Sequence, residues 1–175
     1  PSSFAEHLVR IEHDLLEMAS RAELMVTRAA DALARMDTGL AEQVIRSDDK
    51  VDSLDLQIEK NCLDLLSQQH PEGADLRMVG TILKIITDIE RVGDLAVDIA
   101  RCTLSIEGEM GTAEGIDIPR IALLARTVFH LAIEAYVRQD EALVQQVDAV
   151  ENEVDALYKD LMNQIRELMR AHPEQ

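Results

Sequence analysis

Apolar residues recur at every third or fourth position along most of the chain, which is the spacing of one face of an α-helix. Three such stretches fill the first part of the sequence, at residues 4–36, 40–66 and 76–106. The breaks between them, at 37–39 and 70–73, contain Asp, Gly and Pro residues that favour turns. The pattern therefore predicts three long helices joined by short turns.

Two further helical stretches lie in the second part of the chain, at 118–138 and 140–171. Pro119 suits the first turn of the earlier one, because the N–H that it lacks would have no helical partner there. The segment before it, at 107–117, is rich in Gly and predicts a linker. The two-residue period of a β-strand does not appear in the sequence. We expect an all-α protein with five long antiparallel helices.

The two parts of the chain are copies of one unit. Moving the sequence along itself by 103 residues superposes a series of identical residues: Asp37 on Asp140, Leu40 on Leu143, Val44 on Val147, Val51 on Val154 and Leu54 on Leu157. We expect two tandem three-helix bundles, with the first at 1–107, a linker at 108–117 and the second at 118–175. We expect only two helices of the second bundle in this sequence, with the third, the sixth of the pattern, either truncated or trimmed from the polypeptide or supplied by another protomer.

Acidic residues outnumber basic ones by 34 to 17, which gives a formal net charge of −17. Such a chain repels polyanions, so we expect no nucleic-acid partner and no direct insertion into a membrane. The N-terminal stretch contains acids and a His, and it has no apolar run as long as a signal sequence or a spanning helix. These features favour a soluble, cytoplasmic protein.

The two cysteines, Cys62 and Cys102, fall at apolar positions of the predicted helices. They do not have the C-x-x-C spacing of a metal or redox motif. We expect both to be free thiols in the core of a protein from a reducing compartment.

The third predicted helix has acids four residues apart at Glu90, Asp94 and Asp98, so they lie near one face. Like charges at this spacing cost an isolated helix about 0.2–0.5 kcal/mol per pair. Gly93 lies in the interior of the same helix, where it costs about 1 kcal/mol relative to Ala. We expect an interaction that offsets these costs.

The second predicted helix has a matching pair of acids, Asp48 and Asp52. Asp52 lies about 20 residues before the turn at 70–73, and Asp94 lies about 20 residues after it. An antiparallel hairpin therefore brings these two residues side by side, and Asp48 and Glu90 lie one turn away from them. Four carboxylates in one patch supply oxygen ligands for a hard cation such as Mg²⁺, Mn²⁺ or Fe.

The second unit repeats half of this pattern, as Glu151 and Asp155. A single acid pair of this spacing is weak evidence, because acids on a helix are usually solvated surface. Two other functions stay open. One is a metal-dependent enzyme, which the sequence disfavours because no His, Cys, Tyr or Lys accompanies the acids as a proton shuttle. The other is a structural helical adaptor that binds no metal.

Three segments together closely resemble the PhoU family: DDKVDSLDLQIEKNCLDLLSQQHPEGADLR at 48–77, DLRMVGTILKIITD at 75–88 and IERVGDLAVDIA at 89–100. The resemblance implies two similar three-helix bundles with E(D)-x-x-x-D motifs, which in some members bind multinuclear iron or zinc clusters. It also implies a non-enzymatic regulator, expected to be a homodimer, which represses the phosphate-starvation response. Its expected partners are the ATPase of the phosphate ABC transporter and a phosphate sensor histidine kinase.

The family motifs fall on the acids already identified from their spacing. Position 98 is often Asn or Asp in the family, so it is a weaker candidate, and the second motif pair is only half present. The expected metal ligands are Asp48, Asp52, Glu90, Asp94, Asp98, Glu151 and Asp155.

Overall fold

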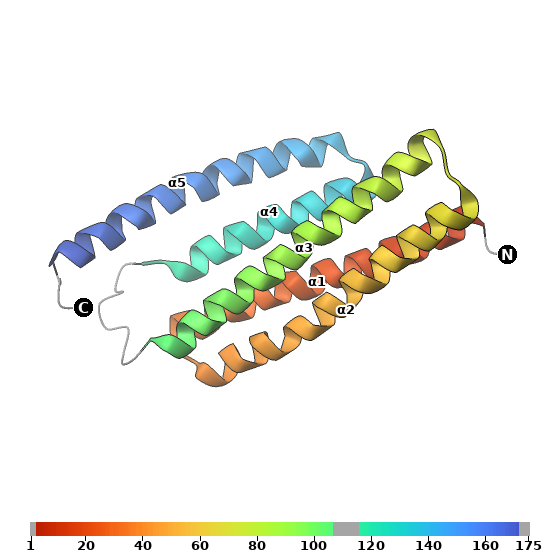
Figure 1. The fold of residues 1–175 in the computed structure, drawn as a ribbon. Helices are drawn as coiled ribbons and strands as arrows, with labels where there is room; N and C mark the ends of the chain where they lie inside the picture. Colours follow the sequence, from red (N-terminus) through yellow and green to blue (C-terminus); the bar gives the residue numbers. More distant parts are fainter. Residues whose placement is uncertain (1–2, 107–115, 172–175) are drawn as a thin grey trace.

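The computed structural model describes residues 3–106 and 116–171, which form five α-helices and their turns, with no strand (Figure 1). The helices are α1 (Phe4–Arg35), α2 (Thr38–Gln69), α3 (Gly73–Ser105), α4 (Ile118–Arg138) and α5 (Glu141–Ala171). The predicted all-α class is confirmed. Helix α3 begins at Gly73, earlier than the predicted start near residue 76. Most of the predicted linker at 108–117 lies outside the described residues.

Helices α1, α2 and α3 pack against one another as a three-helix bundle (Figure 1). Each helix turns one apolar stripe toward the bundle axis, and the fully buried large side chains come from all three: Ile11, Leu15, Met18, Val44, Val51, Ile58, Cys62, Val79, Ile82 and Ile89. Aliphatic side chains and Met fill this core, since only 2% of the chain is aromatic. Full burial of such a side chain contributes about 1.5–3 kcal/mol, so these stripes hold the first bundle together.

The same turn joins α1 to α2 and α4 to α5. In each turn, the residue that follows the preceding helix has a left-handed conformation, with φ of 53° at Met36 and 51° at Gln139. The backbone N–H of the next residue, Asp37 or Asp140, donates to the carbonyl oxygen of an alanine in the last helical turn, at 2.9 and 3.1 Å respectively. Each Asp side chain then accepts a hydrogen bond from a backbone N–H of the following helix. The sequence repeat is therefore also a repeat of structure.

The contact between α1 and α4 joins the two units. Among the described helices, α4 packs against α1 and α5, and α5 packs against α4 alone. Oε2 of Glu23 on α1 lies 3.2 Å from Nδ1 of His130, and Oε1 lies 3.7 Å from Nε of Arg126, both on α4. Three side chains of α4 also pack against the core of the first bundle: Phe129, Ile133 and Tyr136.

The apolar stripe of α5 is more exposed than the equivalent stripe of α2. Seven side chains of α2 are buried: Ala41, Val44, Val51, Leu54, Ile58, Cys62 and Leu65. At the seven equivalent positions of α5, Leu161 is buried, Val144 is 50% exposed and five are half-buried: Val147, Val154, Leu157, Ile165 and Leu168. Helix α3 covers the stripe of α2, and no helix within 3–106 or 116–171 covers α5 in the same way.

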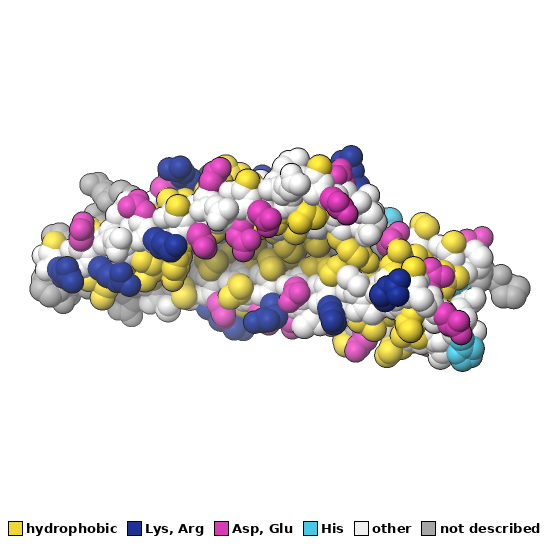
Figure 2. All heavy atoms as spheres, turned by 90° about the horizontal axis from the view of Figure 1, so that it is seen from above, with side chains coloured by type: hydrophobic (Ala, Val, Ile, Leu, Met, Phe, Trp, Pro, Cys, Tyr) yellow, Lys and Arg dark blue, Asp and Glu magenta, His cyan; other side chains and the backbone are white. Residues whose placement is uncertain are grey.

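Large exposed apolar side chains occur on all five helices, and three of them, Val144, Tyr158 and Met169, belong to α5. Figure 2 shows hydrophobic side chains in a strip along the middle of one face, with both acidic and basic side chains on its borders. A hollow of about 410 Å³ lies beside the α4–α5 turn and is lined by Tyr136, Val144 and Val147, among others. None of the described helices combines the length and the apolar character that crossing a membrane requires.

The two free cysteines have different environments. Cys62 is buried in the first bundle, and burial raises the pKa of its thiol to about 11. Cys102 is exposed, so the prediction of a core thiol is wrong there. The next residue, Thr103, takes the buried position, and its hydroxyl donates to the carbonyl oxygen of Ile99 at 3.2 Å.

Candidate functional site

The acids of α2 and α3 lie beside Gly93, where the two helices approach closely. A Cβ atom at position 93 would lie 3.3 Å from Oδ1 of Asp48 and 3.5 Å from Cγ1 of Val51. A larger side chain would therefore push α3 away from α2. This close approach explains why a residue that weakens the helix stands in its interior.

Oδ1 of Asp48 is buried, and no group in the described part of the chain makes a hydrogen bond to it. Burial raises the pKa of this carboxyl group, the negative charges of Asp52 and Asp94 raise it further, and Arg101 lowers it. A buried acceptor without a partner costs about 1–3 kcal/mol. A cation bound to this oxygen would remove that cost, and a proton there would remove the buried charge.

Glu90 belongs to the same group of charges. Burial raises its pKa, and the charges of Asp94, Asp55, Asp52 and Asp48 raise it further, in that order. The four acids predicted from their distance to the turn therefore act on one another electrostatically.

Asp55 is a further acid of this group, and it is not among the ligands predicted from the sequence. Burial raises its pKa, and the charges of Glu59 and Asp52 raise it further. Asp55 lies two helical turns after Asp48 on the same face of α2, but it falls outside the four-residue spacing of the motif. We call Asp48, Asp52, Asp55, Glu90 and Asp94 the carboxylate cluster.

The other predicted ligands lie outside the carboxylate cluster. Asp98 is exposed, and its Oδ1 lies 3.4 Å from Nη1 of Arg101. Its charge is not among those that shift the pKa of Asp48 or Glu90. Glu151 and Asp155 are exposed on α5, which contacts only α4 among the described helices. The structure thus brings together four of the predicted residues and leaves these three apart.

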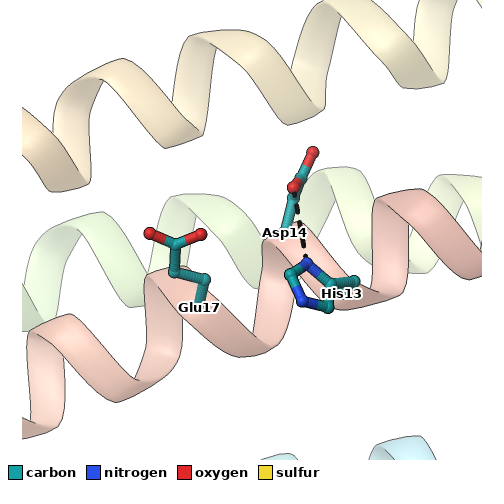
Figure 3. Close-up of side chains that lie close together, drawn as sticks. All are labelled: His13, Asp14 and Glu17. Carbon is teal, nitrogen blue, oxygen red and sulfur yellow. Dashed lines mark ion pairs between the residues drawn. The ribbon is translucent and has the colours of Figure 1, made fainter.

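One group of side chains has its donor atoms closer together. Among the described residues, only His13, Asp14 and Glu17 of α1 place three potential metal-ligand atoms of His, Cys, Asp or Glu side chains within 4.8 Å of one another (Figure 3). Both carboxylates of this group already have protein partners. Oδ2 of Asp14 accepts a hydrogen bond from Gln57 at 2.9 Å, and Oε1 of Glu17 accepts one from Arg21 at 2.7 Å. The oxygen atoms of the carboxylate cluster lie farther apart than the donor atoms of this group. The carboxylate cluster, however, contains Oδ1 of Asp48, which is buried and has no hydrogen-bond partner.

The carboxylate cluster fits a hard cation by the chemistry of its donors. All five side chains offer carboxylate oxygens, which Mg²⁺ and Mn²⁺ prefer and which Fe and Zn also accept. A cation there would offset the mutual repulsion that raises the pKa values of Asp48 and Glu90.

Sequence comparison places these features in a known family. The model of the PhoU domain matches residues 15–103 and 118–175, which begin at equivalent positions of the internal repeat. A phosphate-specific transport system accessory protein PhoU homolog of Burkholderia is 32% identical over 142 residues, which cover 79% of this chain and 60% of that protein. The homolog of Clostridium acetobutylicum is 32% identical over 167 residues, which cover 95% of this chain and 76% of that protein. This chain therefore spans less than two thirds of the Burkholderia relative.

Structural comparison gives the same relationship. The crystal structure of PhoU from Pseudomonas aeruginosa superposes with a TM-score of 0.91 at 29% sequence identity. The superposition covers 98% of this chain and 83% of that one. The chain belongs to the PhoU domain family.

Proposed function

We propose that this chain is a non-enzymatic accessory protein of a phosphate transport system, which restrains phosphate uptake and the phosphate-starvation response. Family membership supports this role, because relatives from Burkholderia and Clostridium acetobutylicum are phosphate-specific transport system accessory proteins. The proposed partners are the transporter ATPase and the phosphate sensor histidine kinase, in the cytoplasm. The charges that act on Asp48 and Glu90 come from carboxylates and Arg101, which supports binding more than proton transfer.

Within this role, the carboxylate cluster binds a divalent cation or a small metal cluster through Asp48, Asp52, Glu90 and Asp94. The observation that carries this proposal is the buried Oδ1 of Asp48, which has no protein partner in the described structure. The cation supplies positive charge between α2 and α3, and these four residues hold it there. Asp55 adds negative charge to the same face.

Adding Mg²⁺ or Mn²⁺ to chelator-stripped protein is expected to raise Tm by several degrees at pH 7 and by much less at pH 4. The pKa values of Asp48 and Glu90 lie above their ordinary values of 3.8 and 4.5 in the folded state. Protonation of these two groups therefore stabilises the folded state fully when the pH is below their ordinary pKa values. This stabilisation is lost as the pH rises through their raised pKa values. At pH 7 a bound cation supplies the stabilisation that protonation no longer gives. At pH 4 protons compete with the cation for the carboxylates. Circular dichroism melting curves measure both.

Asp48→Asn is expected to raise Tm of the stripped protein, because it removes a buried carboxylate and its repulsion by neighbouring acids, together worth about 1 kcal/mol. The same variant loses the rise in Tm with Mn²⁺. Asp98→Asn is the matched control, since Asp98 lies on α3 outside the carboxylate cluster, and it keeps the full rise. An undiminished rise in both Asp48→Asn and Asp94→Asn would exclude the carboxylate cluster as the metal site.

The regulatory role is tested by capture of purified partners. The immobilised chain is expected to retain the phosphate-transporter ATPase or the cytoplasmic part of the sensor kinase, and an unrelated transporter ATPase serves as the control. Failure to retain either partner, with and without Mn²⁺, would contradict the proposed role. Because the Tm measurement needs no partner, the metal proposal and the regulatory proposal can fail separately.

A further inference from the structure

We propose that His13, Asp14 and Glu17 of α1 bind a transition-metal ion such as Zn²⁺, at a site separate from the carboxylate cluster. One potential ligand atom of each side chain lies within 4.8 Å of the other two. Within residues 3–106 and 116–171, no other three His, Cys, Asp or Glu side chains come this close. We call these three residues the α1 site. It goes beyond the proposed function, because it uses other residues and another class of metal.

The spacing of the three residues suits chelation by a single helix. His13 and Glu17 are four residues apart and lie on one face of α1, and Asp14 is the neighbour of His13. Nδ1 of His13 lies 3.8 Å from Oδ1 of Asp14, and Figure 3 shows both carboxylates directed to the same side of the helix. Metal bonds of about 2.0–2.2 Å require the ligand atoms to be about 3 Å apart. The side chain of His13 is 79% exposed, so it can rotate to close this distance.

Hydrogen bonds hold both carboxylates in place and leave one oxygen of each for a metal. Nε2 of Gln57 on α2 donates to Oδ2 of Asp14 at 2.9 Å. Nη2 and Nε of Arg21 both donate to Oε1 of Glu17, at 2.7 and 3.0 Å. Oδ1 of Asp14 and Oε2 of Glu17 therefore accept no hydrogen bond within the described part of the chain. Such hydrogen bonds to the second oxygen orient the carboxylates that bind metals in proteins.

The charges around the α1 site favour a metal that binds imidazole. The hydrogen bond from Arg21 lowers the pKa of Glu17 against the opposing effect of burial, and the charges of Arg21 and Lys50 lower it further. These bases keep Glu17 ionised, but they also reduce the negative charge that attracts a cation. Mg²⁺ depends on anionic oxygen ligands, so it gains little here. Zn²⁺, Cu²⁺ and Ni²⁺ gain a bond to the imidazole of His13, which the carboxylate cluster does not offer.

Calorimetric titration with Zn²⁺ tests the proposal, on the 175-residue chain with Asp48→Asn and Asp94→Asn to remove the carboxylate cluster. We expect one Zn²⁺ per chain, and an affinity that His13→Gln lowers at least about tenfold. His70→Gln is the matched control and keeps the affinity. His70 is exposed at the end of α2 with φ of 46°, and Gln139 shows that Gln adopts this conformation at an equivalent helix end.

Nuclear magnetic resonance identifies the ligand directly. The chain has five His residues, and the ring signals of His13 are assigned by their absence from His13→Gln. On addition of Zn²⁺ they are expected to shift before those of the other four, and an excess of Mg²⁺ is expected not to reverse the shift.

Gln57 is proposed as a positioning residue, because it holds Asp14 from α2 without being a ligand. Gln57→Ala is expected to weaken Zn²⁺ binding about tenfold. Gln68→Ala, at another exposed Gln of α2, is the control and keeps the affinity. Circular dichroism confirms that each variant keeps its helices. An unchanged affinity in Gln57→Ala would contradict its positioning role.

Three results would overturn the α1 site itself. They are the absence of Zn²⁺ binding up to about 1 mM, binding that His13→Gln leaves intact, and ring signals of another His that shift before those of His13. Because the carboxylate cluster is removed in this experiment, its outcome is independent of the metal site in the proposed function.

Discussion

Replacing Leu54 by Ala is expected to lower the free energy of unfolding by about 3 kcal/mol, and replacing Leu157 by Ala is expected to lower it by about 1 kcal/mol. Leu54 is 2% exposed in the core of the first bundle, and Leu157, its equivalent in the second unit, is half-buried. Both substitutions remove the same atoms. Only the site of Leu54 is enclosed on all sides, so only there does truncation leave a cavity.

Urea unfolding followed by circular dichroism gives the total change in the free energy of unfolding. Hydrogen exchange assigns this change to one of the two units, because the two need not unfold together. Leu56→Ala is the control for an exposed leucine, with a change within about 0.5 kcal/mol. Equal losses at Leu54 and Leu157 would show that the second unit is as enclosed as the first.

The helices could be predicted from the sequence because the apolar period and the turn residues act locally. The errors arise where packing decides between neighbouring positions. Cys102 has the more apolar side chain, yet Thr103 is the buried one, and a hydrogen bond within its own helix satisfies its buried hydroxyl. An apolar pattern cannot distinguish these two positions. The contact of Glu23 with His130 joins residues 107 positions apart and has no sequence signal.

The carboxylate cluster was predictable only in part. Equal distance from the turn correctly paired the acids of α2 with those of α3, because antiparallel helices fix that relationship. The ladder of Glu90, Asp94 and Asp98 drifts about 40° around the helix at each step. Which end of the ladder faces α2 depends on how the helices are rotated about their axes, and the spacing does not contain this information. Asp98 consequently turned out to lie apart, and Asp55 of α2 was missed.

Replacing Gly93 by Leu is expected to lower the free energy of unfolding by about 1–3 kcal/mol and to abolish the rise in Tm with Mn²⁺. A Cβ atom alone would lie 3.3 Å from Oδ1 of Asp48, and the remaining atoms of Leu have no space between the helices. Leu favours the helix by about 0.8 kcal/mol relative to Gly, which only partly offsets the overpacking. As α3 moves away from α2, Glu90 and Asp94 move away from Asp48. Urea unfolding and cation-dependent melting measure the two effects.

Gly80 of the same helix separates helix propensity from packing. A Cβ atom at position 80 would have no neighbour within 4 Å, so Gly80→Ala is expected to stabilise the protein by about 1 kcal/mol and to keep the response to Mn²⁺. If Gly80→Ala raises the free energy of unfolding and Gly93→Leu lowers it, the loss at position 93 is caused by the close approach of α2. If Gly93→Leu keeps both its stability and its cation response, the close approach at Gly93 is not what positions the carboxylate cluster. The two glycines thus test whether the acids of α2 and α3 form one site because the helices are held this close.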